Sequence, residues 1–158
     1  REMAEGVLDL AVIYRPEQRP NMHVEELFAD ELVLVTARPE VPFRENYIFV
    51  DWGDTFRAEH AAAFPDIHNP GLTLDLGALG INMLLQMGGA GYFPQRTVSS
   101  CLEDGRLTLV PGTPAFNYPA FVVWQDSFST PEIIEAALGS LHEMANRAWG
   151  AGDRVAGN

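Results

Sequence analysis

The 158-residue sequence has a single cysteine, Cys101, and no apolar run approaching the roughly 20 residues that a helix needs to span a bilayer. One cysteine excludes an internal disulfide framework and is typical of a reducing compartment. Residues 1–14 place acidic side chains before a short apolar stretch and have no cationic leader, so they do not match a secretory signal peptide. We therefore expect a cytoplasmic protein that does not associate with membranes.

Positive charge is also scarce, with 10 Lys and Arg residues against 22 Asp and Glu residues and a formal net charge of −12. Proteins that bind a phosphate backbone depend on clustered Lys and Arg, so this chain is not expected to contact nucleic acid itself. A hydrophobic fraction of 47% with 20% charged residues is that of an ordinary folded domain. The length suffices for one globular unit with a sizeable core, in one or two lobes.

Patterns that carry catalysis or bind metals are missing too. None of the four histidines, His23, His60, His68 and His142, has HxxxH or HExxH spacing. A small enzyme using Asp51, Asp54 and His60, with Glu59 as a further metal ligand, is a hypothesis that the sequence supports poorly, because neighbouring helical residues face different directions. We expect no catalytic residues, no metal site and no cofactor.

Apolar runs and helical periodicity alternate along the chain. Buried strands are predicted at 7–14, 30–38, 47–52 and 120–125, with shorter ones at 72–76, 91–94 and 106–110. Helices are predicted at 56–64, 77–89, 95–105 and 129–150, and the tail 151–158 is expected to be flexible. Strands alternating with helices across short loops predict an α/β fold with mainly parallel sheets.

The stretch "GGAGYFPQR", residues 88–96, raises the question of a phosphate-binding loop. Such a loop follows a strand and opens a helix, so that free backbone N–H groups point at the anion. Here the order is reversed, because the glycines follow a helix and precede a strand. The motif therefore predicts a helix C-cap and a close helix-to-sheet contact rather than a nucleotide site.

The stretch "VDWGDTF", residues 50–56, is the better candidate site, because a strand ends there and a helix begins, the place where α/β folds bind ligands. Asp54 or Thr55 can cap the helix, Trp52 offers a stacking face, and Gly53 lets a ligand approach the backbone. Free N–H groups favour a carboxylate, whereas a cation over Trp52 with Asp51 and Asp54 as counter-charges is equally consistent. A capped helix beside a core tryptophan is the alternative interpretation.

Arg15 follows the strand at 7–14 at its carboxyl end. Its guanidinium either points toward the candidate site at residues 50–56, where it could bind a ligand through two hydrogen bonds, or is solvated in a loop.

Four stretches, taken in order, resemble a known family. They are "GVLDLAVIYRP", "EELFADELVLVTARP", "GALGINMLLQMGGAGYFPQRTVSSCLEDGRLTLVP" and "YPAFVVW", the last before a capped terminal helix. Their order and spacing are similar to the effector-binding domain of LysR-type transcriptional regulators over residues 1 to about 147. The "GxLDLAV" strand and the block from "GGAGYFP" to "GxL" are the most specific parts.

The resemblance implies a type 2 periplasmic-binding-protein-like fold, in which two α/β lobes are joined by two crossing strands and a small effector occupies the cleft. Residues 1–39 and 118–150 would form the first lobe and 40–117 the second, with crossings at 32–39 and 117–123. The effector contacts implied on this sequence are Tyr14 and Arg15 on the first lobe, Asp51, Trp52, Gly53 and Thr55 on the second, and Phe93 from the neighbouring strand.

Family members carry a winged helix-turn-helix, a linker helix and the opening strands of the first lobe before the point where this sequence begins. The resemblance therefore implies an incomplete first lobe, truncated on its N-terminal side, and DNA contact only through a domain outside this chain. We expect a regulatory domain that senses a small molecule and works as a homodimer or tetramer. A solute-binding protein of a transporter, which shares the fold, is the alternative.

Overall fold

The structure, a computed structural model, describes residues 10–14, 16, 18–67, 73–74, 79–125 and 131–152. The chain divides into two compact units, which we call unit 1 (1–30 and 118–158) and unit 2 (31–117), and each is described by itself. The lobes predicted from the sequence, with boundaries near 39 and 118, stay a prediction, because compact packing does not by itself show that two units move as lobes.

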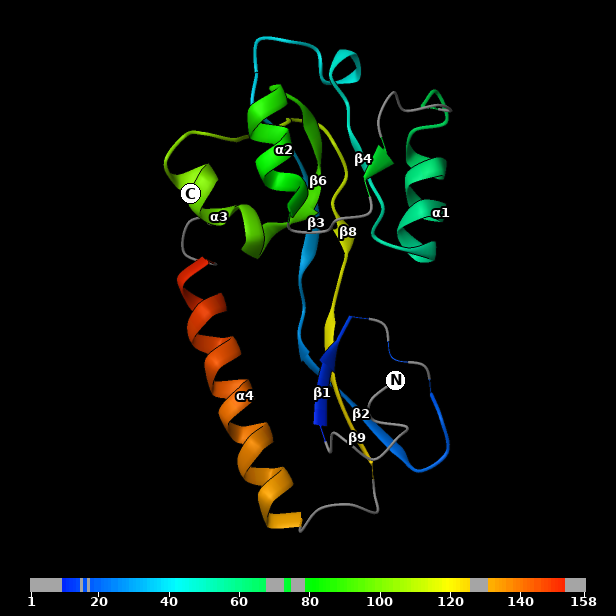
Figure 1. Cartoon of the computed structure of the whole chain (residues 1–158), viewed down its shortest axis with the longest axis vertical. Coiled ribbons are helices and arrows are strands. Elements are labelled where there is room, and N and C mark those ends of the chain that lie inside the picture. The colour runs from blue at the N-terminus through cyan, green and yellow to red at the C-terminus, as the bar shows by residue number, and fades with distance from the viewer. Residues whose placement is uncertain are drawn as a thin grey trace. The chain divides into compact units, whose positions relative to one another are not determined.

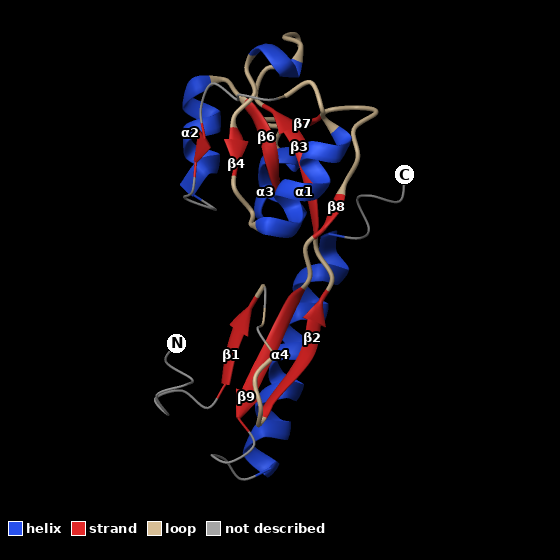
Figure 2. Cartoon of the chain, turned by 90° about the vertical axis from the view of Figure 1, so that its right-hand side faces the viewer, coloured by secondary structure: helices blue, strands red, loops and turns tan. Residues whose placement is uncertain are grey.

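Unit 1 is a three-stranded antiparallel sheet that packs beside one long helix (Figures 1 and 2). Its strand order is β1-β9-β2, and the central strand is the most buried, with Val122 and Val123 at 0% and 1% exposure. The helix lies against β2, and an ion pair joins His142 Nε2 to Glu25 Oε1 at 3.0 Å. The elements are β1 (Leu10–Ile13), β2 (Met22–Phe28), β9 (Ala120–Gln125) and α4 (Pro131–Gly152).

Unit 2 combines a four-stranded antiparallel sheet, a short parallel strand pair and three α-helices. Strand β3 is the central strand of this sheet, since it pairs with β6 on one side and with β7 and β8 on the other. The elements are β3 (Glu31–Thr36), η1 (Phe43–Glu45), β4 (Phe49–Val50), α1 (Asp54–Ala63), β5 (Thr73–Leu74), α2 (Gly80–Met87), β6 (Ala90–Pro94), α3 (Gln95–Glu103), β7 (Thr108–Leu109) and β8 (Phe116–Asn117).

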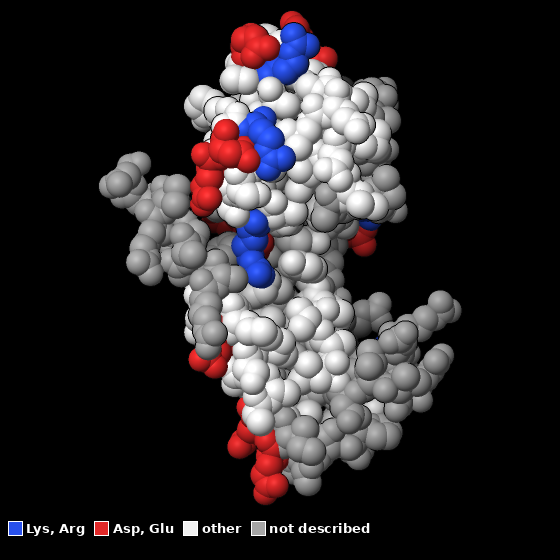
Figure 3. Space-filling model, turned by 60° about the vertical axis from the view of Figure 1, so that its left-hand side comes forward, with Lys and Arg blue, Asp and Glu red and all other residues white. Residues whose placement is uncertain are grey.

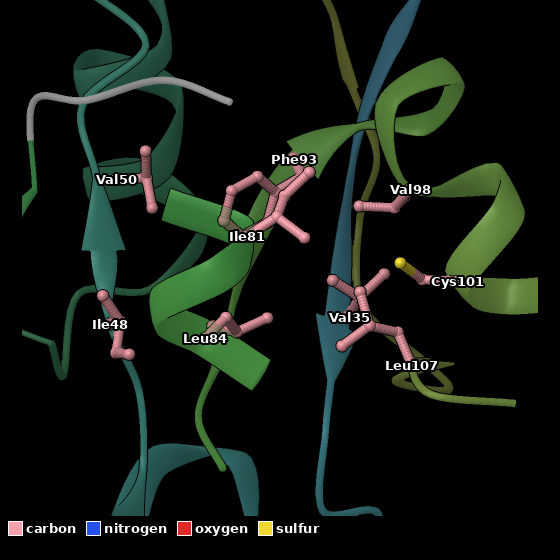
Figure 4. Close-up of a cluster of buried hydrophobic side chains, with 9 residues drawn as sticks. All are labelled: Val35, Ile48, Val50, Ile81, Leu84, Phe93, Val98, Cys101 and Leu107. Carbon is pink, nitrogen blue, oxygen red and sulfur yellow. The ribbon is translucent and has the colours of Figure 1, made fainter. Parts of the chain in front are cut away.

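The core of unit 2 lies between the two helices α2 and α3 and the strands β3, β4 and β6 (Figure 4). Leu84, Phe93 and Val98 are wholly unexposed, because apolar side chains from these elements pack against one another. The cluster consists of Val35, Ile48, Val50, Ile81, Leu84, Phe93, Val98, Cys101 and Leu107.

The glycine motif is a helix C-cap followed by a close crossing, as predicted. Gly88 ends α2 in the left-handed region at φ 67°, and Gly89 N donates to Leu84 O at 3.0 Å. A Cβ on Gly91 would lie 2.8 Å from the backbone oxygen of Ile48, which is too close for any side chain. These positions therefore need glycine for backbone and packing reasons.

The expectation of mainly parallel sheets is wrong for the described residues, since only β4 and β5 pair as parallel strands and the other strand pairs are antiparallel. A continuous apolar run indicates that both faces of a strand are buried, but it does not indicate the direction of the neighbouring strand. Here antiparallel strands are buried by packed helices as well. The run at 7–14 was also expected to be buried on both faces, yet Val12 of β1 is 46% exposed at the edge of its sheet.

Candidate functional site

The turn between β4 and α1 is held in one conformation by its own backbone and side chains. We call residues 51–55 the Trp52 corner. Gly53 has φ 101°, a left-handed value that favours glycine, and its N–H donates to Asp51 Oδ1 at 2.8 Å. This short Asx-type turn redirects the chain from the buried Val50 into the first turn of α1.

Contacts with Tyr92 and Phe93, both among the described residues of unit 2, hold Trp52 in place. Its indole Nε1 donates to the backbone oxygen of Tyr92 at 2.8 Å, and its ring meets the ring of Phe93 edge to face with centroids 6.0 Å apart. The indole is half-buried, so part of it remains accessible. Phe93 is 0% exposed and belongs to the core cluster (Figure 4), so its own side chain has no accessible surface in this structure.

The sequence suggested that Asp54 or Thr55 caps α1, and the structure differs. The helix begins at Asp54, its N-cap is Gly53, and no side chain accepts a hydrogen bond from the first turn. Glycine at this position has no side chain to offer as a cap. The backbone N–H groups of the first turn of α1 are therefore left for solvent or a ligand, and both Asp54 and Thr55 are exposed.

Charge at the corner is organised by Arg57, one turn into α1. Its guanidinium lies 2.5 Å from Asp51 Oδ2 through Nη1 and also pairs with Asp54 through Nη2. These side chains are largely exposed, so the pairs orient the carboxylates more than they stabilise the fold. On the face of the described residues shown in Figure 3, cations likewise lie next to acidic side chains rather than in a separate patch.

A buried aromatic cluster lies beneath α1 and was missed by the sequence reasoning. At its centre His60, 4% exposed, has Nε2 2.6 Å from the hydroxyl of Tyr47, 8% exposed. Burial lowers the pKa of His60 and raises the pKa of the Tyr47 hydroxyl. The available signal was the spacing of Phe56, His60 and Phe64, four residues apart on one helical face. The cluster consists of Phe43, Tyr47, Phe49, Phe56, His60, Phe64, Tyr92 and Phe116.

The hypothetical metal set is not brought together. His60 is hydrogen-bonded to Tyr47 in the interior of unit 2, whereas Asp51 and Asp54 form ion pairs with Arg57 at the surface. Within the described ranges, no group of three or more potential ligand side chains is placed to hold a metal ion. In the same part of the chain no helix has the length and apolar character that crossing a membrane requires.

In unit 1, Tyr14 follows β1 and stacks on Tyr118, with ring centroids 4.5 Å apart and planes inclined by 16°. It is 41% exposed and so keeps an accessible edge. Arg15, the other residue predicted on this side of the site, lies outside the described residues.

A hollow in unit 2, of about 550 Å³, lies away from the predicted site residues. It is open and mostly apolar, and none of the predicted effector contacts lines it. Its walls are two loop segments and the strand ends beside them, at residues 36, 39–43 and 108–111.

The fold is shared with regulatory domains of known structure. The bromide-bound regulatory domain of HypT from Salmonella typhimurium matches with a TM-score of 0.73 and 14% identity over 90% of this chain and 76% of that one. The reduced OxyR regulatory domain from Pseudomonas aeruginosa gives 0.67 and 18% over 91% and 75%. The regulatory domain of MetR, a LysR family regulator from N. meningitidis, gives 0.63 and 16% over 90% and 72%.

Curated protein sequences give no significant match to this chain. The family described as the LysR substrate binding domain, in contrast, matches residues 1–146, almost the stretch over which the sequence motifs resemble it. The resemblance is therefore confirmed, and so is the expectation that the chain is not an enzyme, because this is a family of regulatory domains. The chain belongs to the LysR substrate-binding domain family and is an effector-sensing regulatory domain of a LysR-type transcription regulator.

Proposed function

We propose that this domain binds its small-molecule effector at the Trp52 corner, with Asp51, Trp52, Gly53 and Thr55 as contacts and Phe93 supporting the indole from behind. The observation that carries the proposal is the fixed, half-buried Trp52 next to a helix start that no side chain caps. A stacking surface and unused backbone donors then lie within one short turn. Tyr14 and Arg15 are the contacts proposed from the other lobe.

The proposed signal is a change in the angle between the lobes when the effector binds. An effector shifts such an equilibrium only by the difference between its affinities for the two arrangements, so contacts from both lobes are what make it a switch. The change would alter the geometry of a homodimer or tetramer on DNA, which a winged helix-turn-helix outside this chain would contact. The regulator is proposed to work in the cytoplasm.

Residues 32–39 and 117–123 are proposed to carry the chain between the lobes. Support for paired crossings comes from the junctions at 30–31 and 117–118. Tyr118 N donates to Asp30 O at 2.7 Å, and Glu31 pairs with Asn117 where β3 meets β8. The two segments therefore run side by side where the chain changes units, as a hinge of two strands requires.

A thermal-shift screen of the whole chain against a panel of metabolites that includes both carboxylic acids and amines tests this proposal. A ligand present at about 100 times its dissociation constant stabilises the folded state by about 2.7 kcal/mol. For a chain of this size that raises the melting temperature by roughly 5–10 °C. The hit is then retested with Trp52→Ala and with a matched control, Trp124→Ala, which removes an indole from β9 of unit 1.

The proposal predicts that Trp52→Ala abolishes the ligand-induced shift and that Trp124→Ala keeps it, whatever each variant does to the melting temperature of the free protein. The proposal fails if the Trp52→Ala protein responds to the hit as strongly as the wild type. The family match favours this regulator over a transporter's solute-binding protein.

A further inference from the structure

A buried, hydrogen-bonded pair of titratable side chains lies directly beneath the helix that begins at the Trp52 corner. His60 is on the inner face of α1, and its Nε2 is 2.6 Å from Tyr47 Oη. Both residues are under 9% exposed. A buried hydrogen bond among apolar side chains fixes the position of the helix, because breaking it leaves two buried polar groups without a hydrogen-bond partner.

The groups that face His60 are almost all aromatic. The rings of Phe49 and Phe64 lie 5.0 Å and 5.2 Å from the imidazole, that of Phe56 lies 5.4 Å away, and that of Tyr92 lies 6.1 Å away. The titratable groups among these contacts are the hydroxyls of Tyr47 and Tyr92, and burial raises the pKa of each.

Charged groups lie only at the margin of this cluster. Arg44 places its guanidinium 4.7 Å from the Phe43 centroid and 5.8 Å from the Phe64 centroid, where it pairs with Asp66. On α1 itself, Arg57 and Glu59 are exposed. No carboxylate is therefore among the described contacts of the imidazole, so a proton on His60 gains no counter-charge there.

Two routes connect this pair to the candidate site. The first is α1, whose buried face carries Phe56 and His60 one turn apart, so a displacement at His60 tilts the helix start. The second is Tyr92, whose ring packs against His60 and whose backbone oxygen holds the Trp52 indole at 2.8 Å. Both routes start from the aromatic cluster around His60.

We propose that His60 is a positioning residue for the Trp52 corner, and that the His60–Tyr47 pair makes this corner acid-sensitive. Uptake of a proton by the imidazole places an uncompensated charge among aromatic rings, loosens α1 and weakens the hydrogen bond from Trp52 to Tyr92. The expected decrease in effector affinity at acid pH rests on the proposed function. The weakening of the hydrogen bond from Trp52 to Tyr92 at acid pH does not depend on the proposed function.

The direction of the pH effect follows from burial. The neutral imidazole is favoured inside the cluster, so the folded-state pKa of His60 lies below its ordinary value. The ordered conformation of the Trp52 corner is therefore fully populated above about pH 6.5. It is lost as the pH falls through the folded-state pKa of His60, which lies below that value.

The test is an NMR titration of the uniformly labelled full chain without ligand, from about pH 8 to about pH 5. It follows the indole N–H signal of Trp52, identified by its loss in Trp52→Phe. In parallel it follows the imidazole signals, with His60 assigned by comparison with variants lacking each of the other histidines. We expect the Trp52 signal to shift toward that of a solvent-exposed indole with the same midpoint as His60, below about 6.5.

A double variant, His60→Phe with Tyr47→Phe, replaces both partners by apolar rings and leaves no buried polar group unpaired. It is expected to abolish the Trp52 titration. The matched control, His142→Gln, removes a histidine that pairs with Glu25 in unit 1 and is expected to leave the titration unchanged. Should the double variant fail to fold, the comparison of midpoints in the wild type still decides the matter.

The inference is overturned if the Trp52 signal does not change over this pH range, if its midpoint differs from that of His60, or if the change persists in the folded double variant. None of these outcomes depends on an effector. A failure here is thus distinct from a failure of the thermal-shift screen, which tests the binding site itself.

Discussion

Replacing Gly91 by alanine should destabilise unit 2 strongly, because the new methyl group meets a backbone atom that cannot rotate away. The ideal Cβ lies 2.8 Å from Ile48 O, whereas ordinary contacts begin near 3.4 Å. The segment before β4 must therefore move, yet two hydrogen bonds next to the contact tie it to β6. Ile48 N donates to Ala90 O at 2.7 Å, and Ala90 N donates to Asn46 O at 3.0 Å.

The cost can be worked from these contacts. Overpacking of this kind costs about 1–3 kcal/mol, and each weakened hydrogen bond adds about 0.5–1.5 kcal/mol at most. We expect a total loss of about 2–4 kcal/mol in the free energy of unfolding of unit 2, measured by urea denaturation. The ligand-induced thermal shift should also shrink, since β6 carries the backbone oxygen that holds Trp52.

Gly139→Ala is the control, because it makes the same chemical change at a glycine inside α4 where a Cβ meets nothing within 4 Å. Alanine is the better helix former by about 1 kcal/mol, so this variant should be neutral or slightly more stable than the wild type. If Gly91→Ala were as stable as the wild type, the packing of β6 against the segment before β4 would be misplaced and the reasoning refuted.

Three further predictions concern the core, the surface charges and the pH dependence of stability. Leu84→Ala empties a fully buried site and should lower the free energy of unfolding by about 2–5 kcal/mol in urea, whereas Met87→Ala, at a side chain 56% exposed, should change it by less than about 0.5 kcal/mol. Arg57→Gln breaks two exposed ion pairs and should cost less than about 1 kcal/mol in the same assay; a larger loss would show that the pairs support the fold. In calorimetry at stepped pH, the melting temperature should fall more steeply below about pH 6.5 in the wild type than in the Tyr47→Phe, His60→Phe double variant, because the unfolded state protonates His60 more readily; parallel curves would contradict this.

Most elements of the fold were accessible from the sequence, because each carries a strong local signal. The strand 120–125 and the helix at 56–64 lie almost where predicted, since apolar periodicity and Pro65 delimit them. Strand direction was not accessible, because a covered strand is apolar in either direction. Strand β2 was missed entirely, since "MHVEELF" mixes charged and apolar residues at an exposed edge and follows a proline-rich loop.

The candidate site was only partly accessible. The strand-to-helix transition drew attention to Trp52 and Gly53, which the structure places together. Arg57 was not singled out, because an exposed arginine near two aspartates looks like any solvated surface charge. His60 was weighed as a metal ligand, whereas its partner Tyr47 is thirteen residues away in the segment before β4. Contacts between distant segments leave no periodic signal in one sequence, so this buried pair became visible only in three dimensions.

The central claim is that a small molecule is sensed at the Trp52 corner. It is tested most directly by titrating a stabilising metabolite into the labelled chain while recording the indole N–H signals of its three tryptophans. We expect a saturable shift of the Trp52 signal whose dissociation constant equals that from the thermal-shift titration. Saturation of the stabilising effect with the Trp52 signal unmoved would contradict the account.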